Sequence, residues 1–294
     1  MSPVIEPYLS AIITGLLNGG FYALIALGLS LIWGVLDVVN FAQGDYMMLG
    51  CFVTFFALNL AGIDPLLSIP LSFLLIGAAG AFTEVTAIEK IMDAPMVTQI
   101  FTTFSLLLII RYGGQTIFGA STRSVTTWYS DIVIGKGWYS ALLIKVISFF
   151  VALAIAGVFF LFLKRTYTGI AIRATAQDME TANLMGIPVK RMRAIAFALG
   201  CAISAVGGSF LSLFFPIRPV MGGPFGLYMF VIVVLGGFGS MKGTIVGGLI
   251  IGVTEAVAGT ALAGIAGHLK TMVVFIVFLV ILVVKPSGLF GRET

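Results

Sequence analysis

The run Tyr8–Trp33, YLSAIITGLLNGGFYALIALGLSLIW, contains no charged residue and is long enough to cross a membrane as one helix. A helix needs about 20 apolar residues to span a hydrocarbon core of about 30 Å. Similar charge-free runs follow along the chain, at 46–63, 65–83, 94–110, 146–163, 194–217, 219–241, 243–254 and 271–284. Because these runs are continuously apolar and do not alternate with a period of two, they predict helices and not a β-barrel. The expected fold class is an all-α, polytopic transmembrane helix bundle.

The composition supports a chain that resides in lipid. Hydrophobic residues make up 60% and charged residues 10% of the 294 positions, and the mean hydropathy is +1.14. A soluble domain carries about 25% charged residues, so this class is excluded. The N-terminus has no basic region and no small-residue cleavage site, so we expect the first run to be a span and not a signal peptide. Cys51 and Cys201 lie in apolar runs, where we expect packing and not a disulfide.

Basic residues are concentrated in one segment of the chain. Six of the 16 Lys and Arg residues lie within 164–193, and the positive-inside rule places that segment in the cytoplasm. Tracing the apolar runs outward from it puts the N-terminus outside and the tail 285–294 inside, which requires an odd number of crossings. Eight long segments are evident, and splitting 225–264 at its glycine-rich centre supplies a ninth. We therefore expect eight or nine spans.

Two interruptions divide the apolar pattern. The first, GVLDVVNFAQGD at 34–45, holds four polar side chains between two apolar runs. The second, GGFGSMKG at 236–243, leaves a short half-run on each side. Short, glycine-interrupted segments are typical of the broken helices of transporters, so discontinuous helices are expected. The first interruption has two interpretations, a short solvated loop or an unwound stretch that lines a cavity.

Other glycines and a few polar groups lie within the spans. Small-residue pairs four positions apart predict close helix packing; they are Gly15 and Gly19, Gly243 and Gly247, and Gly248 and Gly252. An ionisable group inside a span, such as Glu255, is a candidate for a transport path, although a hydrogen bond to a neighbouring helix explains it equally well. The candidate translocation-path residues are Asn18, Asn40, Gln43, Gly44, Gly236, Gly237, Gly239 and Glu255.

The basic segment contains the sequence ETANLMGIP at 180–188. Helix-forming residues run from Ile170 to Met185, and Gly186 followed by Pro188 predicts a stop. We therefore expect one amphipathic helix at the membrane surface, ended by a sharp turn and flanked by basic residues. Its composition leaves two roles open, contact with lipid or docking to a soluble partner.

This segment resembles the coupling loop of bacterial ABC importers, whose pattern is Glu-Ala-Ala, three further residues and Gly. The chain has Glu180, Ala182 and Gly186 at the matching positions, with Thr181 in place of the first Ala. Other stretches resemble the signature of branched-chain amino-acid permeases; they are 23–34, Asn40-Phe41-Ala42-Gln43-Gly44, Met47 and Gly50, Gly169-x3-Arg173-Ala174, Gly186-Ile187, and Gly236-Gly237-x-Gly239-Ser240. The resemblance covers nearly the whole chain, and the size suits the H-type subunit.

The resemblance implies one permease domain over 1–294, with a coupling loop at 164–193, in the bacterial inner membrane. It implies a second homologous permease, usually in a heterodimer, two cytoplasmic ATP-binding subunits and a periplasmic substrate-binding protein. The residues that would contact an ATP-binding subunit are Glu180, Thr181, Ala182, Gly186 and Ile187. The family transports mainly leucine, isoleucine and valine, and some relatives are assigned to urea, amides or other amino acids.

Enzyme motifs are absent from the sequence. The P-loop pattern does not occur, because 239–244 holds its letters in the wrong order, so we expect no ATP hydrolysis by this chain. His268 has no Cys or carboxylate near it in sequence, and we expect no metal, no cofactor and no nucleic-acid partner. Two rival classes remain. An ion-coupled secondary transporter would not need a coupling helix, and an intramembrane enzyme would need clustered ionisable residues at one depth.

Overall fold

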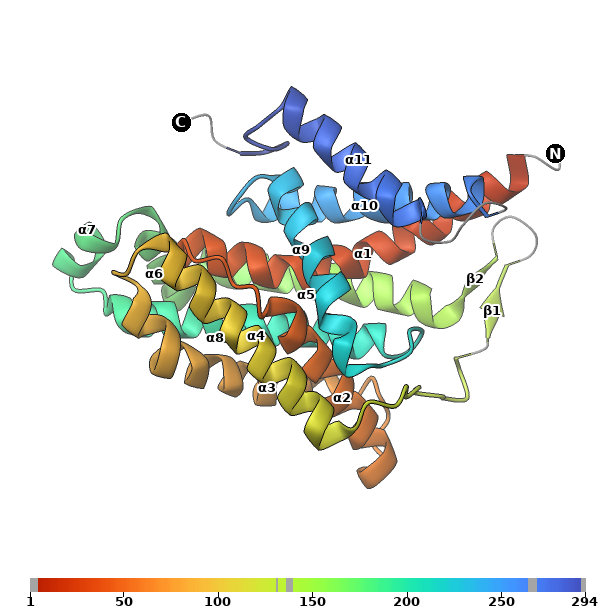
Figure 1. Ribbon diagram of the computed structural model, residues 1–294, viewed down its shortest axis with the longest axis horizontal. Helices are drawn as coiled ribbons and strands as arrows, with labels where there is room; N and C mark the ends of the chain where they lie inside the picture. The colour runs from red at the N-terminus through yellow and green to blue at the C-terminus, as the bar shows by residue number, and fades with distance from the viewer. Residues whose placement is uncertain (1–4, 131, 136–139, 264–268, 292–294) are drawn as a thin grey trace.

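The computed structural model describes residues 5–130, 132–135, 140–263 and 269–291, and over them the chain is a bundle of helices (Figure 1). The membrane-length helices are α1 (Ile5–Leu36), α2 (Gln43–Ala61), α3 (Ile69–Thr83, continued by a π turn to Ile88 and a 3-10 turn to Ile91), α4 (Met96–Phe118), α5 (Leu143–Arg165), α8 (Val189–Leu211), α9 (Gly222–Gly236, preceded by a 3-10 turn from Pro219) and α10 (Met241–Ala261). The shorter helices are α6 (Tyr167–Gln177), α7 (Met179–Leu184) and α11 (Leu269–Val284). The strands β1 (Val133–Ile134) and β2 (Ala141–Leu142) pair antiparallel.

The helix count confirms the predicted fold class. Among the described residues, eight helices are long and apolar enough to cross a membrane, and α11 is a shorter apolar helix. The outward faces of the peripheral helices carry exposed large apolar side chains, for example Leu74 on α3, Phe101 on α4, Val158 on α5 and Val283 on α11. A surface of this kind suits hydrocarbon and not water. The chain is a multi-pass membrane protein.

The long helix α1 forms the centre of the bundle and packs directly against α10. A Cβ atom added to Gly15 would lie 2.7 Å from Cα of Val253, and one added to Gly19 would lie 2.7 Å from Cα of Leu249. Such contacts leave no room for a side chain, so these glycines let the two backbones meet. The packing role predicted for the small-residue pairs is confirmed at this crossing.

The first interruption is a non-helical segment inside the bundle, buried at every position except Asp37 and Phe41. It begins at Asp37, which has a positive φ of 54°, and α2 begins at Gln43. The backbone carbonyl of Val39 accepts a hydrogen bond from Thr103 on α4. Asp45 pairs with Arg111, which also lies on α4. Because these two positions on α4 are about 12 Å apart along the axis, the segment advances beside α4. The solvated-loop interpretation is therefore wrong.

The second interruption separates α9 from α10, as the split of 225–264 predicted. Gly237 and Gly239 have φ values of +98° and +70°, which favour glycine. The open end of α9 is covered by the C-terminal segment, because the N–H groups of Leu289 and Phe290 donate to the carbonyls of Leu235 and Gly236 at 2.8 and 3.0 Å. The predicted discontinuity is confirmed, and the tail closes it.

The single surface helix predicted over 170–185 is wrong. Two helices, α6 and α7, replace it, and the backbone is extended at Asp178 between them. Asp178 accepts hydrogen bonds from the N–H groups of Glu180 and Thr181 at 2.9 and 3.0 Å. An aspartate that bonds backbone N–H groups in this way caps a new helix and interrupts the preceding one.

Candidate functional site

The candidate coupling residues lie on α7 and the turn after it, at one end of the bundle (Figure 1). The helix is short, and its start is fixed by Asp178. Besides the two backbone bonds, the Thr181 hydroxyl donates to Asp178 Oδ2 at 2.6 Å. Hydrogen bonds from the hydroxyl and N–H of Thr181 and the N–H of Glu180 hold the pKa of the Asp178 carboxyl below its ordinary value. Thr181, which departs from the family pattern, thus supplies a capping contact.

The end of α7 presents an exposed apolar tip. Leu184 and Met185 are 81% and 78% exposed, whereas Ala182 is buried against the bundle. Gly186 follows with a φ of +82°, and a side chain there would meet open space. The N–H of Ile187 donates back to the carbonyl of Ala182 at 3.1 Å. The predicted stop at Gly186 is confirmed, and it leaves the tip standing clear of the helix bundle.

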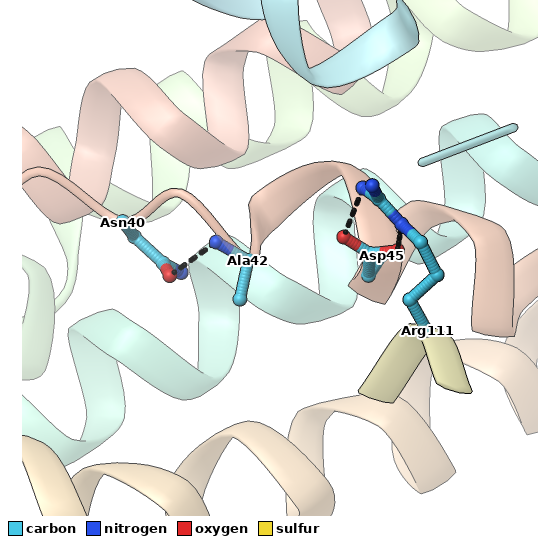
Figure 2. Close-up of polar contacts among 4 residues, drawn as sticks. All are labelled: Asn40, Ala42, Asp45 and Arg111. Atoms are coloured by element: carbon cyan, nitrogen blue, oxygen red, sulfur yellow. Dashed lines mark hydrogen bonds and ion pairs between the residues drawn. The ribbon is translucent and has the colours of Figure 1, made fainter. Parts of the chain in front are cut away.

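Two of the candidate path residues, Asn40 and Gln43, form one closed hydrogen-bond network. Asn40 Nδ2 donates to Gln43 Oε1 at 2.9 Å. Figure 2 shows the second contact of this amide, in which Asn40 Oδ1 accepts from the N–H of Ala42 at 3.1 Å. Gln43 Nε2 donates to the carbonyl of Gly200 at 3.0 Å and to the Ser204 hydroxyl at 2.6 Å. Both amide side chains are buried. Their polar groups therefore tie the first break to α8 and are not open to a solute in this conformation.

A buried ion pair lies directly after this network. Arg111 Nε donates to Asp45 Oδ1 and Arg111 Nη2 to Asp45 Oδ2, both at 3.0 Å (Figure 2). The Asp45 side chain has no exposed surface and that of Arg111 is 19% exposed. Gly222, the first residue of α9, packs on the carboxylate, since a Cβ there would lie 2.5 Å from Asp45 Oδ1. The pair joins α2 to α4 at the start of α9, where a helix dipole also favours the anion.

Gly44 lies in the same region and allows α2 to approach α9. A Cβ atom on Gly44 would overlap the carbonyl oxygen of Gly222 and would lie 2.9 Å from Cα of Gly226. The position therefore has a packing requirement that only glycine meets. Its place beside Asp45 puts it at the junction of the broken elements.

The two breaks lie next to each other. Trp33, near the end of α1, stacks on Phe238 of the second break with ring centroids 4.3 Å apart. Phe41 of the first break stacks on Phe230 of α9 at 5.2 Å. A Cβ atom on Gly239 would lie 3.2 Å from Cα of Gly34. Asn40, Gln43, Gly44, Gly236, Gly237 and Gly239 thus belong to one region.

Asn18 and Glu255 belong to a different region. Glu255 is 14 positions beyond the start of α10, about 21 Å along its axis, and Asn18 lies in the N-terminal half of α1. Both line a cleft of about 660 Å³. Tyr22 donates to Glu255 Oε2 at 2.6 Å, and Lys270 pairs with Glu255 Oε1 at 3.1 Å. The eight candidate residues therefore form two groups and not one continuous site.

Arg111, Tyr22 and Lys270 were not among the predicted site residues. Arg111 and Lys270 border apolar runs, so in the sequence they resemble residues at helix ends. Their positions do not indicate that Asp45 and Glu255 are their partners. Tyr22 lies within an apolar helix and gives no signal of its own. Of the other predicted features, the described residues contain no group of three His, Cys, Asp or Glu residues that could hold a metal ion. His268 lies outside the described residues.

The chain is similar to known membrane permeases over nearly its whole length. Residues 11–282 match the family model described as branched-chain amino acid transport system / permease component. The high-affinity branched-chain amino acid transport system permease protein LivH of Escherichia coli K12 is 31% identical over 308 residues, which cover 97% of this chain and 96% of that protein. The corresponding protein BraD of Pseudomonas aeruginosa is 29% identical over 307 residues, covering 99% and 98%. The chain belongs to the family of branched-chain amino acid transport system permease components.

Proposed function

We propose that this chain is the membrane-spanning subunit of an ATP-driven importer that moves leucine, isoleucine and valine across the bacterial cytoplasmic membrane. Residues 1–294 then act as one permease domain. Its partners are a second homologous permease, two cytoplasmic ATP-binding subunits and a periplasmic substrate-binding protein. The names of the relatives support the substrate, since each is a branched-chain amino acid transport permease. The apolar surface of the bundle supports the membrane location.

The observation that carries the coupling role is the exposed tip of α7. Leu184 and Met185 expose apolar side chains, yet the helix beneath them is fixed by the cap at Asp178 and by the buried Ala182. A rigid apolar knob of this kind fits a groove in a soluble protein. In the proposal, the groove belongs to an ATP-binding subunit, and residues 164–193 transmit its closure to the bundle.

The broken helices supply the moving part of the proposed path. Asn40 ties the segment 37–42 to Gln43 by one hydrogen bond, Gln43 bonds α8 by two more, and the Asp45–Arg111 pair ties α2 to α4. Polar contacts of this kind have discrete alternative partners, whereas the glycine contacts of α1 with α10 do not. The conformation described here is then a closed one, and opening exchanges these contacts for contacts with water or substrate.

Reconstitution of the complete importer in proteoliposomes tests the proposal. Radiolabelled leucine should accumulate only when ATP, the ATP-binding subunits and the binding protein are all present. Uptake that persists without the ATP-binding subunits would show a secondary transporter. ATP-driven uptake of urea or an amide in place of leucine would support the ATP-driven importer but refute branched-chain amino acids as its substrate.

Two variants at position 186 test whether this turn couples ATP hydrolysis to transport, independently of whether the importer assembles. Gly186→Val places a β-branched residue at a φ of +82°, which it adopts only with strain, whereas Gly186→Asn tolerates that conformation. A Cβ atom at this position meets no atom within 4 Å. We expect Val to lower leucine uptake per ATP hydrolysed and Asn to retain it. Equal coupling ratios in the two variants would contradict a docking role for this turn.

A further inference from the structure

The cleft at Glu255 lies at the end of the bundle opposite α7. It is bounded by the N-terminal half of α1, the C-terminal half of α10 and the start of α11, and its volume of about 660 Å³ falls within the range of small-molecule sites. Figure 1 shows the N-terminal end of α1 and α7 at opposite ends of the molecule. With 164–193 in the cytoplasm, the cleft faces the outside, where a binding protein releases substrate.

One wall of the cleft is a polar stripe on α1. Ser10, Thr14 and Asn18 are spaced four residues apart, so they lie on one face of the helix, and all three line the cleft. The Asn18 Oδ1 atom is buried and has no hydrogen-bond partner among the described residues. A buried acceptor of this kind is costly unless a donor reaches it. The stripe is therefore suited to a polar ligand and not to a lipid chain.

The residues that line the cleft also include one negative and one positive charge. Glu255 Oε1 and Lys270 Nζ are 3.1 Å apart, and the Tyr22 hydroxyl holds the second carboxylate oxygen at 2.6 Å. The Glu255 side chain is 12% exposed and that of Lys270 is 43% exposed. A lysine ammonium has three donors, so Lys270 can turn toward a ligand while Tyr22 keeps Glu255 in place.

We propose that this cleft binds the zwitterionic head of the substrate amino acid on the external side of the permease. The α-ammonium group lies between the Glu255 carboxylate and Asn18 Oδ1, and the α-carboxylate accepts from Lys270. The aliphatic side chain then lies against Phe215 and Ala256, which also line the cleft. The inference rests on the proposed import of branched-chain amino acids.

The charges of the cleft select this ligand class. Glu255 and Lys270 together carry no net charge, so a zwitterion satisfies both when it separates them. Urea and simple amides carry no charge and replace neither partner of the ion pair. A cation would leave the Lys270 ammonium without its counter-ion, and an anion would leave the largely buried Glu255 carboxylate without its own.

Thiol protection measures occupancy of the cleft directly. The full chain, purified with its co-expressed transport subunits but without the binding protein, is placed in lipid nanodiscs. The native thiols of Cys51 and Cys201 are buried, so Ser10→Cys introduces a reporter in the cleft that reacts with a water-soluble thiosulfonate. L-Leucine should slow this reaction, while isopentylamine, which lacks the carboxylate, and urea should not. Ser121→Cys, on an exposed loop, is the control and should react at the same rate with and without leucine.

Variants of the charged pair complete the test. Glu255→Gln in the Ser10→Cys background should raise the half-protecting leucine concentration about 10- to 100-fold, because it removes a charge-assisted hydrogen bond. Unreactive native thiols verify that the variant is folded. If the native thiols become reactive in Glu255→Gln, Lys270→Met is used instead, because position 270 is more exposed. Lys270→Met should abolish the preference for leucine over isopentylamine.

The outcomes separate this inference from the proposed function. ATP-driven leucine uptake without leucine protection would overturn the cleft and leave the importer intact. Protection by urea but not by leucine would overturn the zwitterion as the ligand. Protection by leucine that Glu255→Gln removes would support the site even if ATP-driven uptake failed, and in that case only the importer proposal would fall.

Discussion

The Asp45–Arg111 pair should be the strongest single polar contact between helices in the bundle. Asp45→Asn keeps the shape of the side chain and removes its charge, so the guanidinium of Arg111 loses its counter-ion. Removing one partner of a buried pair costs about 3–5 kcal/mol. We expect about 3 kcal/mol, the lower limit, because one fifth of the Arg111 side chain is exposed and retains some solvation.

The reverse change tests the same pair from the other side. Arg111→Gln leaves the Asp45 carboxylate without a cation in a position with no exposed surface. This should cost about 4 kcal/mol, within the same range, because the carboxyl escapes part of the penalty by taking up a proton. The double variant replaces the ion pair by two amides that can bond each other, so it should be less destabilised than the sum of the single changes by about 2 kcal/mol.

The assay uses the two native thiols as reporters of unfolding. Cys51 on α2 and Cys201 on α8 are buried, so a fluorogenic maleimide reacts with them only when the bundle opens. Lys190→Ala is the matched control, since Lys190 pairs with Glu89 at 2.7 Å but is 79% exposed, and its loss should leave the unfolding transition unchanged. If the two single changes at Asp45 and Arg111 add within about 0.5 kcal/mol in the double variant, the pair does not act as a unit and the reasoning is refuted.

Two further predictions concern the second break and α7. Gly243→Ala should destabilise the bundle by about 1–3 kcal/mol in the same thiol assay, because its Cβ would overlap the carbonyl of Gly236; Gly157→Ala, where a Cβ meets no atom within 4 Å, should not. A destabilisation equal at both positions would contradict close packing at the break. The pKa of Asp178 is lowered by hydrogen bonds, so the cap of α7 should be fully formed above the unfolded value of about 3.9 and should be lost only as the pH falls through the lower, folded value. A ¹³C NMR titration in nanodiscs checks this, and Thr181→Val should raise the pKa; an unchanged pKa would count against the hydroxyl as its main cause.

The sequence predicted the helices well because the lipid leaves few alternatives. In lipid, a continuous apolar run must satisfy its backbone hydrogen bonds within itself, so 8–33 could only be a helix. The helix α1 indeed covers Ile5–Leu36. Glycines predicted the second break correctly, since Gly237 and Gly239 require positive φ. Small-residue spacing likewise predicted that α1 would pack closely on another helix, although not that α10 would be the partner.

The errors came from side chains whose effect depends on a partner. Helix propensity favoured one helix over 170–185, but the Asp178 carboxylate bonds the next N–H groups and starts a second helix. Four polar residues at 34–45 left two interpretations open, a solvated loop and an unwound stretch, because the sequence does not show that Gly200 and Ser204 of α8 satisfy Gln43 inside the bundle. Arg111 could not be assigned to Asp45 because 66 positions separate them. Local pattern cannot identify such long-range partners.

Hydrogen-bond satisfaction distinguishes the two groups of candidate path residues. The Asn40 and Gln43 amides each find partners within the protein, so in this conformation they stabilise the first break and offer a solute nothing. The Asn18 Oδ1 atom is equally removed from solvent but accepts no bond within the described residues, and Asn18 lines the same cleft as Glu255 and Lys270. In a low-dielectric interior an unmet acceptor is expensive, and a bound donor recovers that cost. A zwitterionic solute, which offers an ammonium group to Asn18 and Glu255 and a carboxylate to Lys270, therefore gains more at the cleft than at the break, because the break must first lose its own contacts.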